Sequence, residues 1–275
     1  MPDTFSLVDI GVNLAHDSFD ADRDEVLARA RRAGVTRMVI TGSSLHSSEA
    51  AVELAQRDPG LFATVGTHPH HADALDEGLL PRFAALAADP RAVAIGECGL
   101  DFFRDFSPRD RQESAFRLQL ELAMRTGLPV FLHQRDAHER FITILDDCGA
   151  GMPAGVAHCF TGGPAEMKAY LDRGLYIGVT GWLCDERRGD ALREAVRYLP
   201  LDRVMIETDA PYLLPRDLEP RPRSRRNEPM HLPHVLETLA RHMGRAVEAV
   251  AAATTRNAEA LFRLPGLITP GPSTM

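Results

Sequence analysis

Eight short runs rich in aliphatic and β-branched residues recur along the chain, and a stretch with helical character separates each run from the next. The runs are LVDIGVN from Leu7, RMVITG from Arg37, LFATVG from Leu61, AVAIGE from Ala92, PVFLH from Pro129, GVAHCF from Gly155, LYIGVT from Leu175 and RVMIETD from Arg203. Alternation of helices with strands that are apolar almost throughout is typical of parallel strands buried on both faces. Eight such units in 275 residues predict an α/β fold, the (β/α)8 TIM-like barrel. A doubly wound open sheet is the alternative, but the sequence has neither the dinucleotide-binding fingerprint nor the phosphate loop G-x-x-x-x-G-K-[ST].

Helices are expected between these strands. The clearest one has Ser107 as its N-cap, Pro108 at its first position and Gly127 just beyond its end. Its buried face is predicted to carry four apolar side chains, Phe116, Leu120, Ala123 and Met124. The other predicted helices cover 21–33, 48–57, 79–88, 137–145, 165–173, 190–198, 234–243 and 246–261. We expect one catalytic barrel domain over residues 1–265 and a flexible tail at 266–275.

The charge balance limits the kind of partner that the surface can attract. A formal net charge of −8 argues against a protein that coats nucleic acid with an entirely basic surface, so a polyanionic substrate has to be met locally. One segment, 215–226, offers a local concentration of arginines: Arg216, Arg221, Arg223, Arg225 and Arg226. The sequence shows no signal peptide and no run of 18 apolar residues, which predicts a cytoplasmic protein without membrane contact. We expect it to be a monomer.

The four cysteines are scattered and form no C-x-x-C pair, which argues against a disulfide framework and against a structural zinc site. We expect them to be small core residues, including Cys98 and Cys159, which neighbour polar residues at the ends of strands.

Polar residues stand where the predicted strands end, and in a barrel of this kind the carboxyl ends of the strands carry the chemistry. In chain order they are Asn13, the run THPH that contains His68, then Glu97, His133 with Arg135, His158 and Asp209. Imidazoles and carboxylates that converge on one mouth are the ligands of a divalent metal ion. Each residue taken alone has a simpler explanation: a hydrogen-bonded core histidine for His133 or His158, a salt bridge between Glu97 and Arg104, or a helix cap for Asp209.

Several longer motifs carry a family resemblance. The stretches GTHPH, AIGECGLDF, VFLHQRDAHERF, AHCFTG, GVTGWLCDERRG and IETDAPYLLPRDLEPRPRSRRNEP resemble the TatD family of metal-dependent deoxyribonucleases, from about Val8 to Phe262. The resemblance implies a TIM-like barrel that hydrolyses phosphodiester bonds as a 3′–5′ exonuclease on single-stranded DNA or RNA, in repair or degradation. Transferred residue by residue, it implies a metal site of Glu97, His133, His158 and Asp209. It also implies that Asp209 and Glu97 are catalytic and that His68, Arg135 and Asn13 contact the substrate phosphate.

The opening of the chain departs from the D-x-H-x-H motif that is usual in this family. Here it reads Asp9, Gly11 and Asn13 at the matching positions, so two imidazoles are absent. The ligands that remain on this side are oxygens, which suit Mg²⁺ better than Zn²⁺; Mn²⁺ is an alternative, and Zn²⁺ is an expected occupant in crystals. If the missing histidines explain the preference, the double substitution Gly11→His with Asn13→His should tighten zinc binding.

Other functions fit the same scaffold. A metal-activated water attacks a carbonyl carbon as well as phosphorus, so a lactonase or a D-aminoacyl-tRNA deacylase is an alternative. A barrel that has lost catalysis and only binds partners is another. Trp182 and Phe102 are candidate platforms for stacking nucleic-acid bases.

Overall fold

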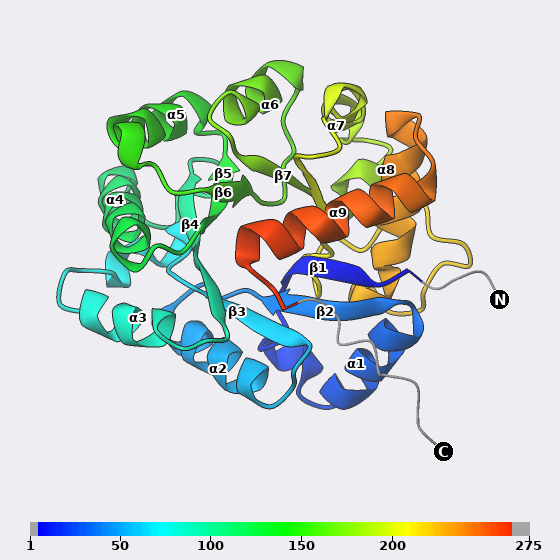
Figure 1. Ribbon diagram of the computed structural model, residues 1–275, viewed down its shortest axis with the longest axis horizontal. Helices are drawn as coiled ribbons and strands as arrows, with labels where there is room; N and C mark the ends of the chain where they lie inside the picture. The colour runs from blue at the N-terminus through cyan, green and yellow to red at the C-terminus, as the bar shows by residue number, and fades with distance from the viewer. Residues whose placement is uncertain (1–4, 266–275) are drawn as a thin grey trace.

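The computed structural model describes residues 5–265 and contains a single eight-stranded parallel sheet in the order β1 to β8 (Figure 1). Helices follow the strands and surround them, so the predicted (β/α)8 barrel is confirmed. The proposed tail, 266–275, lies outside the described residues. The strands are β1 (Leu7–Val12), β2 (Val35–Ile40), β3 (Leu61–Val65), β4 (Ala92–Asp101), β5 (Val130–Arg135), β6 (Gly155–Ala157), β7 (Tyr176–Val179) and β8 (Val204–Ile206).

The helices agree with the sequence prediction to within a few residues at each end. The α-helices are α1 (Arg23–Arg32), α2 (Leu45–Gln56), α3 (Leu80–Ala87), α4 (Arg109–Thr126), α5 (His138–Asp147), α6 (Pro164–Leu171), α7 (Asp190–Ala195), α8 (Leu232–Met243) and α9 (Val247–Phe262). The 3₁₀ helices are η1 (Asp17–Phe19), η2 (Pro69–Ala74), η3 (Gly149–Gly151), η4 (Gly181–Cys184), η5 (Val196–Tyr198) and η6 (Pro229–His231). No helix within residues 5–265 has both the length and the apolar character needed to cross a membrane.

Two details of α4 differ from the prediction. Pro108 is its N-cap, and the Ser107 hydroxyl instead donates to the His70 carbonyl at 3.2 Å, so it ties the start of α4 to η2. Met124 is 42% exposed because it lies at the edge of the apolar stripe, where it packs near Gly151, whereas Phe116, Leu120 and Ala123 are buried as predicted.

The seam between the last and first strands is closed by a few hydrogen bonds. The Asp209 amide donates to the Gly11 carbonyl at 2.8 Å, and the Asn13 amide donates to the Ala210 carbonyl at 2.7 Å. Below them, the buried Asp9 carboxylate accepts hydrogen bonds from the Thr208 amide at 2.9 Å and from the Thr208 hydroxyl at 2.6 Å. The seam therefore brings the residues after β8 beside the residues that end β1.

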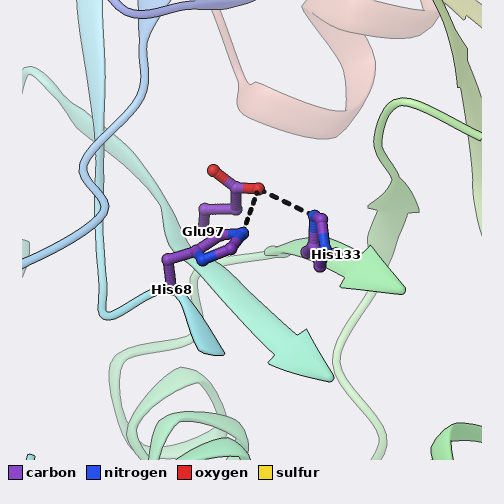
Figure 2. A group of neighbouring side chains, drawn as sticks. All are labelled: His68, Glu97 and His133. Carbon is purple, nitrogen blue, oxygen red and sulfur yellow. Dashed lines mark ion pairs between the residues drawn. The ribbon is translucent and has the colours of Figure 1, made fainter. Parts of the chain in front are cut away.

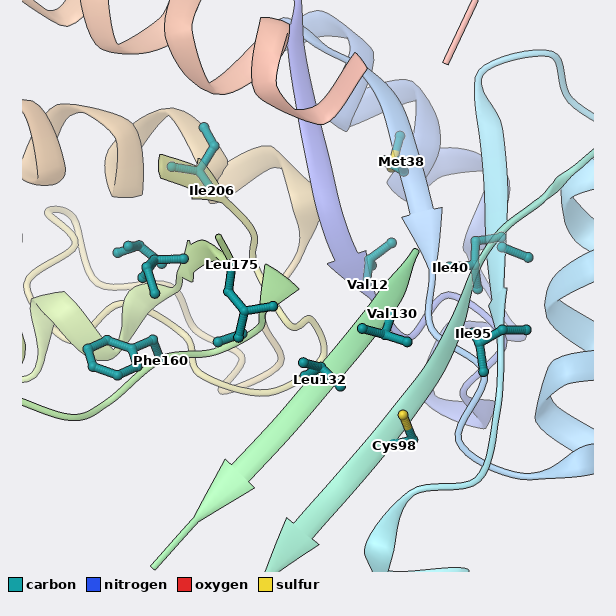
Figure 3. Close-up of a cluster of buried hydrophobic side chains, with 14 of the residues drawn as sticks. Val12, Met38, Ile40, Ile95, Cys98, Val130, Leu132, Phe160, Leu175 and Ile206 are labelled. Atoms are coloured by element: carbon teal, nitrogen blue, oxygen red, sulfur yellow. The ribbon is translucent and has the colours of Figure 1, made fainter. Parts of the chain in front are cut away.

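The amino end of the barrel is closed by α9, which crosses the strands in Figure 1. Apolar residues of α9, including Leu261 and Phe262, pack with side chains from the strands, such as Val8, Phe62 and Phe131. A second apolar layer fills the space between the strands and the outer helices, and Cys98 lies in it with Ile95, Val130 and Leu132 (Figure 3). Cys98 is fully buried, which confirms its predicted place in the core, whereas the same prediction is wrong for Cys159, which is only partly buried because it lies at the open end of the barrel. With the amino end filled, polar chemistry is confined to the opposite end.

Candidate active site

A cavity of about 570 Å³ opens at the carboxyl ends of the strands. All seven residues proposed from the sequence line it: Asn13, His68, Glu97, His133, Arg135, His158 and Asp209. They come from six different strand ends, so the fold alone brings them together.

Glu97 lies at the centre of this group. Three imidazole nitrogens face its Oε1 atom: His158 Nε2 at 2.8 Å, His133 Nδ1 at 3.1 Å and His68 Nε2 at 3.4 Å. Figure 2 shows the carboxylate of Glu97 between His68 and His133. One ligand atom from each of these three residues lies within 4.8 Å of the others, a spacing that fits a single metal ion. Within residues 5–265, Glu97 forms no ion pair with Arg104. The alternative explanation of Glu97 as the partner in an ordinary salt bridge therefore does not apply.

The other ring nitrogen of each imidazole also faces a polar group. His68 Nδ1 accepts a hydrogen bond from the His70 amide at 3.1 Å, which leaves Nε2 facing Glu97. His158 Nδ1 contacts Glu207 Oε2 at 3.1 Å, and His133 Nε2 lies 3.5 Å from Asp101 Oδ2. A carboxylate partner such as Glu207 fixes the ring orientation and raises the basicity of a histidine that binds metal, whereas His133 Nε2 has no hydrogen-bond partner among residues 5–265.

Two carboxylates of the site, those of Asp101 and Glu207, were not predicted from the sequence. Asp101 is the last residue of β4 and also contacts His70 Nε2 at 2.8 Å. Glu207 directly follows β8 and is fully buried. The signal that was present is spacing: Asp101 stands four residues after Glu97, and Glu207 stands two residues before Asp209. A prediction that assigns one acidic residue to each strand end does not find Asp101 or Glu207.

Glu207 occupies the space that the absent side chain of Gly11 leaves. A Cβ atom on Gly11 would lie 2.3 Å from Glu207 Oε2, and a Cβ atom on Gly178 would lie 2.5 Å from Glu207 Oε1. The prediction that Gly11→His with Asn13→His tightens zinc binding therefore requires Glu207 to move, because its buried carboxylate lies at the place of the new side chain. Asp9 is also not a free ligand, because Thr208 binds both of its oxygens.

Asp209 lies on the other side of the cavity, where Asn13 Nδ2 donates to its Oδ1 at 3.0 Å. Burial raises the pKa of Asp209 to about 7, and the charges of Glu97 and Glu207 act in the same direction. The backbone of Asp209 is in the left-handed region with φ of 54°, as are those of Cys159 at 47° and Leu213 at 52°, which also line the cavity. Such conformations are uncommon outside glycine and gather at functional sites.

The electrostatics of the cluster favour bound positive charge. Burial opposes ionisation of Glu97, but the histidines that face this carboxyl outweigh burial and hold its pKa well below its usual range. Burial holds the pKa of His68 well below its usual value, so this ring is neutral. Because its Nδ1 accepts from the His70 amide, its single proton is on Nε2, which faces Glu97. Burial acts in the same sense on His158, but Glu207 and Glu97 together raise the pKa of that ring well above its usual value.

Arg135 and several aromatic side chains form the rim. The Arg135 guanidinium lies 4.0 Å from the Phe103 ring centre and 5.9 Å from that of Trp182. Among the described residues it makes no ion pair with Asp136 or Glu139, and its guanidinium contacts these two rings, so its charge remains available to a ligand. Trp182 does line the cavity, as do the largely exposed rings of Phe106 and Tyr212.

Two other predictions concern the rim of the cavity: that Phe102 stacks on bases and that the arginines of segment 215–226 form a basic surface. Phe102 stacks against Arg109 at 4.4 Å and does not line the cavity. In the arginine segment, Arg216 binds Glu186, and Arg226 binds Asp22 and Glu228. These two arginines therefore hold the loop in place. Three are exposed, namely Arg221, Arg223 and Arg225.

The sequence profile of one known family, described as TatD related DNase, matches residues 8–263. The chain belongs to the TatD family. It is 51% identical over 258 residues to the 3'-5' ssDNA/RNA exonuclease TatD of Salmonella typhimurium, which covers 94% of this chain and 99% of the relative. It is 52% identical over 256 residues to the protein of the same name from Citrobacter rodentium, with 93% and 97% covered.

Solved structures of TatD-type proteins share the fold. The TatD homologue YJJV of Escherichia coli superimposes with a TM-score of 0.87 at 27% identity, over 95% of this chain and all of that chain. A hydrolase of the TatD family from Entamoeba histolytica gives 0.86 at 27% identity, over 95% of this chain and 99% of its own. The barrel of this TatD chain is therefore the one its family uses.

Proposed function

We propose that this chain is a metal-dependent 3′–5′ exonuclease that hydrolyses phosphodiester bonds in single-stranded DNA and RNA. The observation that supports this most is the convergence of three imidazole nitrogens on Glu97 within a cavity that Arg135 and aromatic rings surround. The relatives named 3'-5' ssDNA/RNA exonuclease TatD align with this chain over nearly its whole length.

The donor set fits a divalent metal ion. Glu97 with His68 and His133 offers one oxygen and two nitrogens within reach of one ion, and His158 lies against the same carboxylate. Three imidazole nitrogens that face one oxygen need protons or a cation between them, because their lone pairs otherwise meet that of the oxygen. A bound ion would polarise the phosphate and lower the pKa of a water molecule.

The remaining residues supply positioning and proton transfer. Asp209, whose carboxylate accepts a hydrogen bond from Asn13, would take a proton from the attacking water. Arg135 offers two parallel N–H donors to the scissile phosphate. Bases next to that phosphate would stack on Trp182, Phe106 and Tyr212.

We propose Mg²⁺ as the working ion, with Mn²⁺ as a substitute, because the side of the cavity formed by Asn13 and Asp209 offers oxygen donors. Zn²⁺ fits the imidazole side better and is the expected occupant in crystals. A protein stripped of metal and then supplied with each ion in turn separates these assignments by rate.

The deciding experiment uses purified protein and single strands of DNA and RNA labelled at the 5′ end. The expected result is stepwise shortening from the 3′ end with release of mononucleotides, stimulated by Mg²⁺ and abolished by chelation. The variant Asp209→Asn should be folded and inactive, whereas Asp202→Asn, an exposed aspartate distant from the cavity, should match the wild type. Equal turnover by Asp209→Asn would remove Asp209 from the mechanism.

A lactone and a D-aminoacyl-tRNA, tested in parallel, address the alternative hydrolases, and binding without turnover of any substrate would indicate the non-catalytic barrel. The sedimentation behaviour of the protein tests the proposed monomer, and cell fractionation tests the proposed cytoplasmic location.

A further inference from the structure

A second cluster of possible metal ligands lies outside the catalytic cavity. Its members are Cys184 at the end of η4, Asp217 in the segment after β8, and His234 in the first turn of α8. One ligand atom from each lies within 4.8 Å of the other two, and His234 Nε2 is 2.7 Å from Asp217 Oδ1. None of the three lines the cavity that holds Glu97.

The three groups form a donor set of a recognisable kind. A thiolate, an imidazole and a carboxylate are the ligands that Zn²⁺ takes in proteins, and two negative ligands balance the charge of a divalent ion. Cys184 is buried, whereas Asp217 is exposed and His234 is half-buried. A cation therefore has a path from solvent to a thiol that is otherwise enclosed.

A second observation points to a ligand at this place. Thr238 lies one helical turn after His234 on α8; it is 2% exposed, and its Oγ1 has no hydrogen-bond partner among residues 5–265. The Thr238 hydroxyl lies beside the Cys184 sulfur, where it can donate to a thiolate. A cation on Cys184 would create the thiolate to which Thr238 can donate.

We propose that Cys184, Asp217 and His234 form a separate binding site for a divalent cation of the zinc class. On binding, the Cys184 S–H bond breaks, its proton passes to solvent and the sulfur bonds the metal. His234 contributes the Nε2 lone pair and Asp217 one carboxylate oxygen, in place of the hydrogen bond between them. Water takes the fourth position. The C-x-x-C rule applied to the sequence could not find this site, because its ligands come from three separate elements.

The proposed metal site would connect two segments at the rim of the catalytic cavity to α8. Cys184 belongs to the same short helix as Trp182, and Asp217 lies four residues after Leu213; both Trp182 and Leu213 line the cavity. A metal at this place ties both to α8, the orange helix beside α9 in Figure 1.

Cobalt provides a test that does not depend on turnover. Full-length protein freed of metal is titrated with Co²⁺, and the thiolate-to-cobalt absorption in the near ultraviolet is followed. We expect this absorption in the wild type and in Cys159→Ser, which removes the thiol of the catalytic cavity, and no such absorption in Cys184→Ser. His234→Gln and Asp217→Asn should weaken cobalt binding at least tenfold. Replacement of a residue that only supports a metal ligand already lowers metal affinity roughly 10-fold, and these two residues are proposed as ligands.

The matched control is His242→Gln, on the last turn of the same helix, which should leave the titration unchanged. Absence of thiolate absorption at saturating Co²⁺ would overturn the proposal, as would its loss in Cys159→Ser. If Cys184→Ser does not fold, the partly exposed positions Asp217 and His234 decide the question. Unchanged affinity in both of those variants also contradicts the site.

Discussion

At the scale of single residues, Glu207 has the role that is hardest to see in the sequence. It contacts His158 Nδ1 at 3.1 Å and accepts a hydrogen bond from the Cys159 amide, so it fixes which nitrogen of His158 faces Glu97. An anionic acceptor at Nδ1 keeps the proton there, so Nε2 is the nitrogen that would bind a metal ion.

Replacement Glu207→Gln should therefore lower metal affinity and activity by roughly 10- to 100-fold while the fold persists. The amide would place an N–H group against Nδ1, which shifts the ring proton to Nε2 and blocks the metal-binding lone pair. Isothermal titration with Mn²⁺ and rates of nucleotide release measure the two effects. Glu121→Gln, on the exposed side of α4, is the matched control. A loss of stability without a loss of metal affinity would show that Glu207 only supports packing.

Asp9 gives stability a specific dependence on pH. Burial raises its pKa from 3.8 to about 7, against the opposing hydrogen bonds from Thr208. The folded state holds this proton more tightly than the unfolded state does. The contribution of Asp9 to the free energy of unfolding is therefore complete below pH 3.8 and is lost as pH rises through 7, by on the order of 4 kcal/mol.

Asp9→Asn cannot ionise and keeps an oxygen for the Thr208 amide. The free energy of unfolding of this variant, minus that of the wild type, should therefore increase between pH 5 and pH 8 in urea titrations. Parallel curves for the two proteins across this range would refute the assignment.

At the scale of elements, the seam between β1 and β8 depends on two glycines that make room for Glu207. Gly11→Ala places a Cβ atom 2.3 Å from Glu207 Oε2 and 3.0 Å from Phe131 Cζ. The expected loss of stability is about 1–3 kcal/mol, as for overpacked cores. Gly163→Ala is the control, because a Cβ atom there meets nothing within 4 Å. In a Glu207→Ala background the cost of Gly11→Ala should be much smaller, and additive costs would exclude this contact as the cause.

The same seam shows why the sequence predicted the elements better than the site. Strand positions follow from local apolar runs, and the polar residues that end them, such as His133 and Asp209, could be identified one strand at a time. The role of Glu207 depends on the space left by Gly11 and Gly178, which have no side chains. Both glycines are distant from Glu207 in the sequence. Ser107 shows the same limit, because its partner, the His70 carbonyl, becomes available only when η2 packs against α4.

At the scale of the whole molecule, the two ends of the barrel divide stability from chemistry. The amino end is filled by α9, where the nearly buried Phe262 packs with apolar residues of the strands. The other end carries the cavity, and beside it the ring of Phe103, which is 53% exposed, lies under Arg135.

Two substitutions of the same type should therefore have opposite effects. Phe262→Ala should cost about 3–5 kcal/mol in unfolding free energy, because it removes a large buried ring, and kcat/KM of the folded fraction should stay unchanged. Phe103→Ala removes an exposed ring, so stability should change by no more than about 0.5 kcal/mol. It should raise KM for a single strand because Arg135 loses the aromatic surface that holds its guanidinium in place. Urea titrations and initial rates on both variants measure the four quantities. A fall in kcat/KM of folded Phe262→Ala would mean that packing at the amino end reaches the catalytic residues.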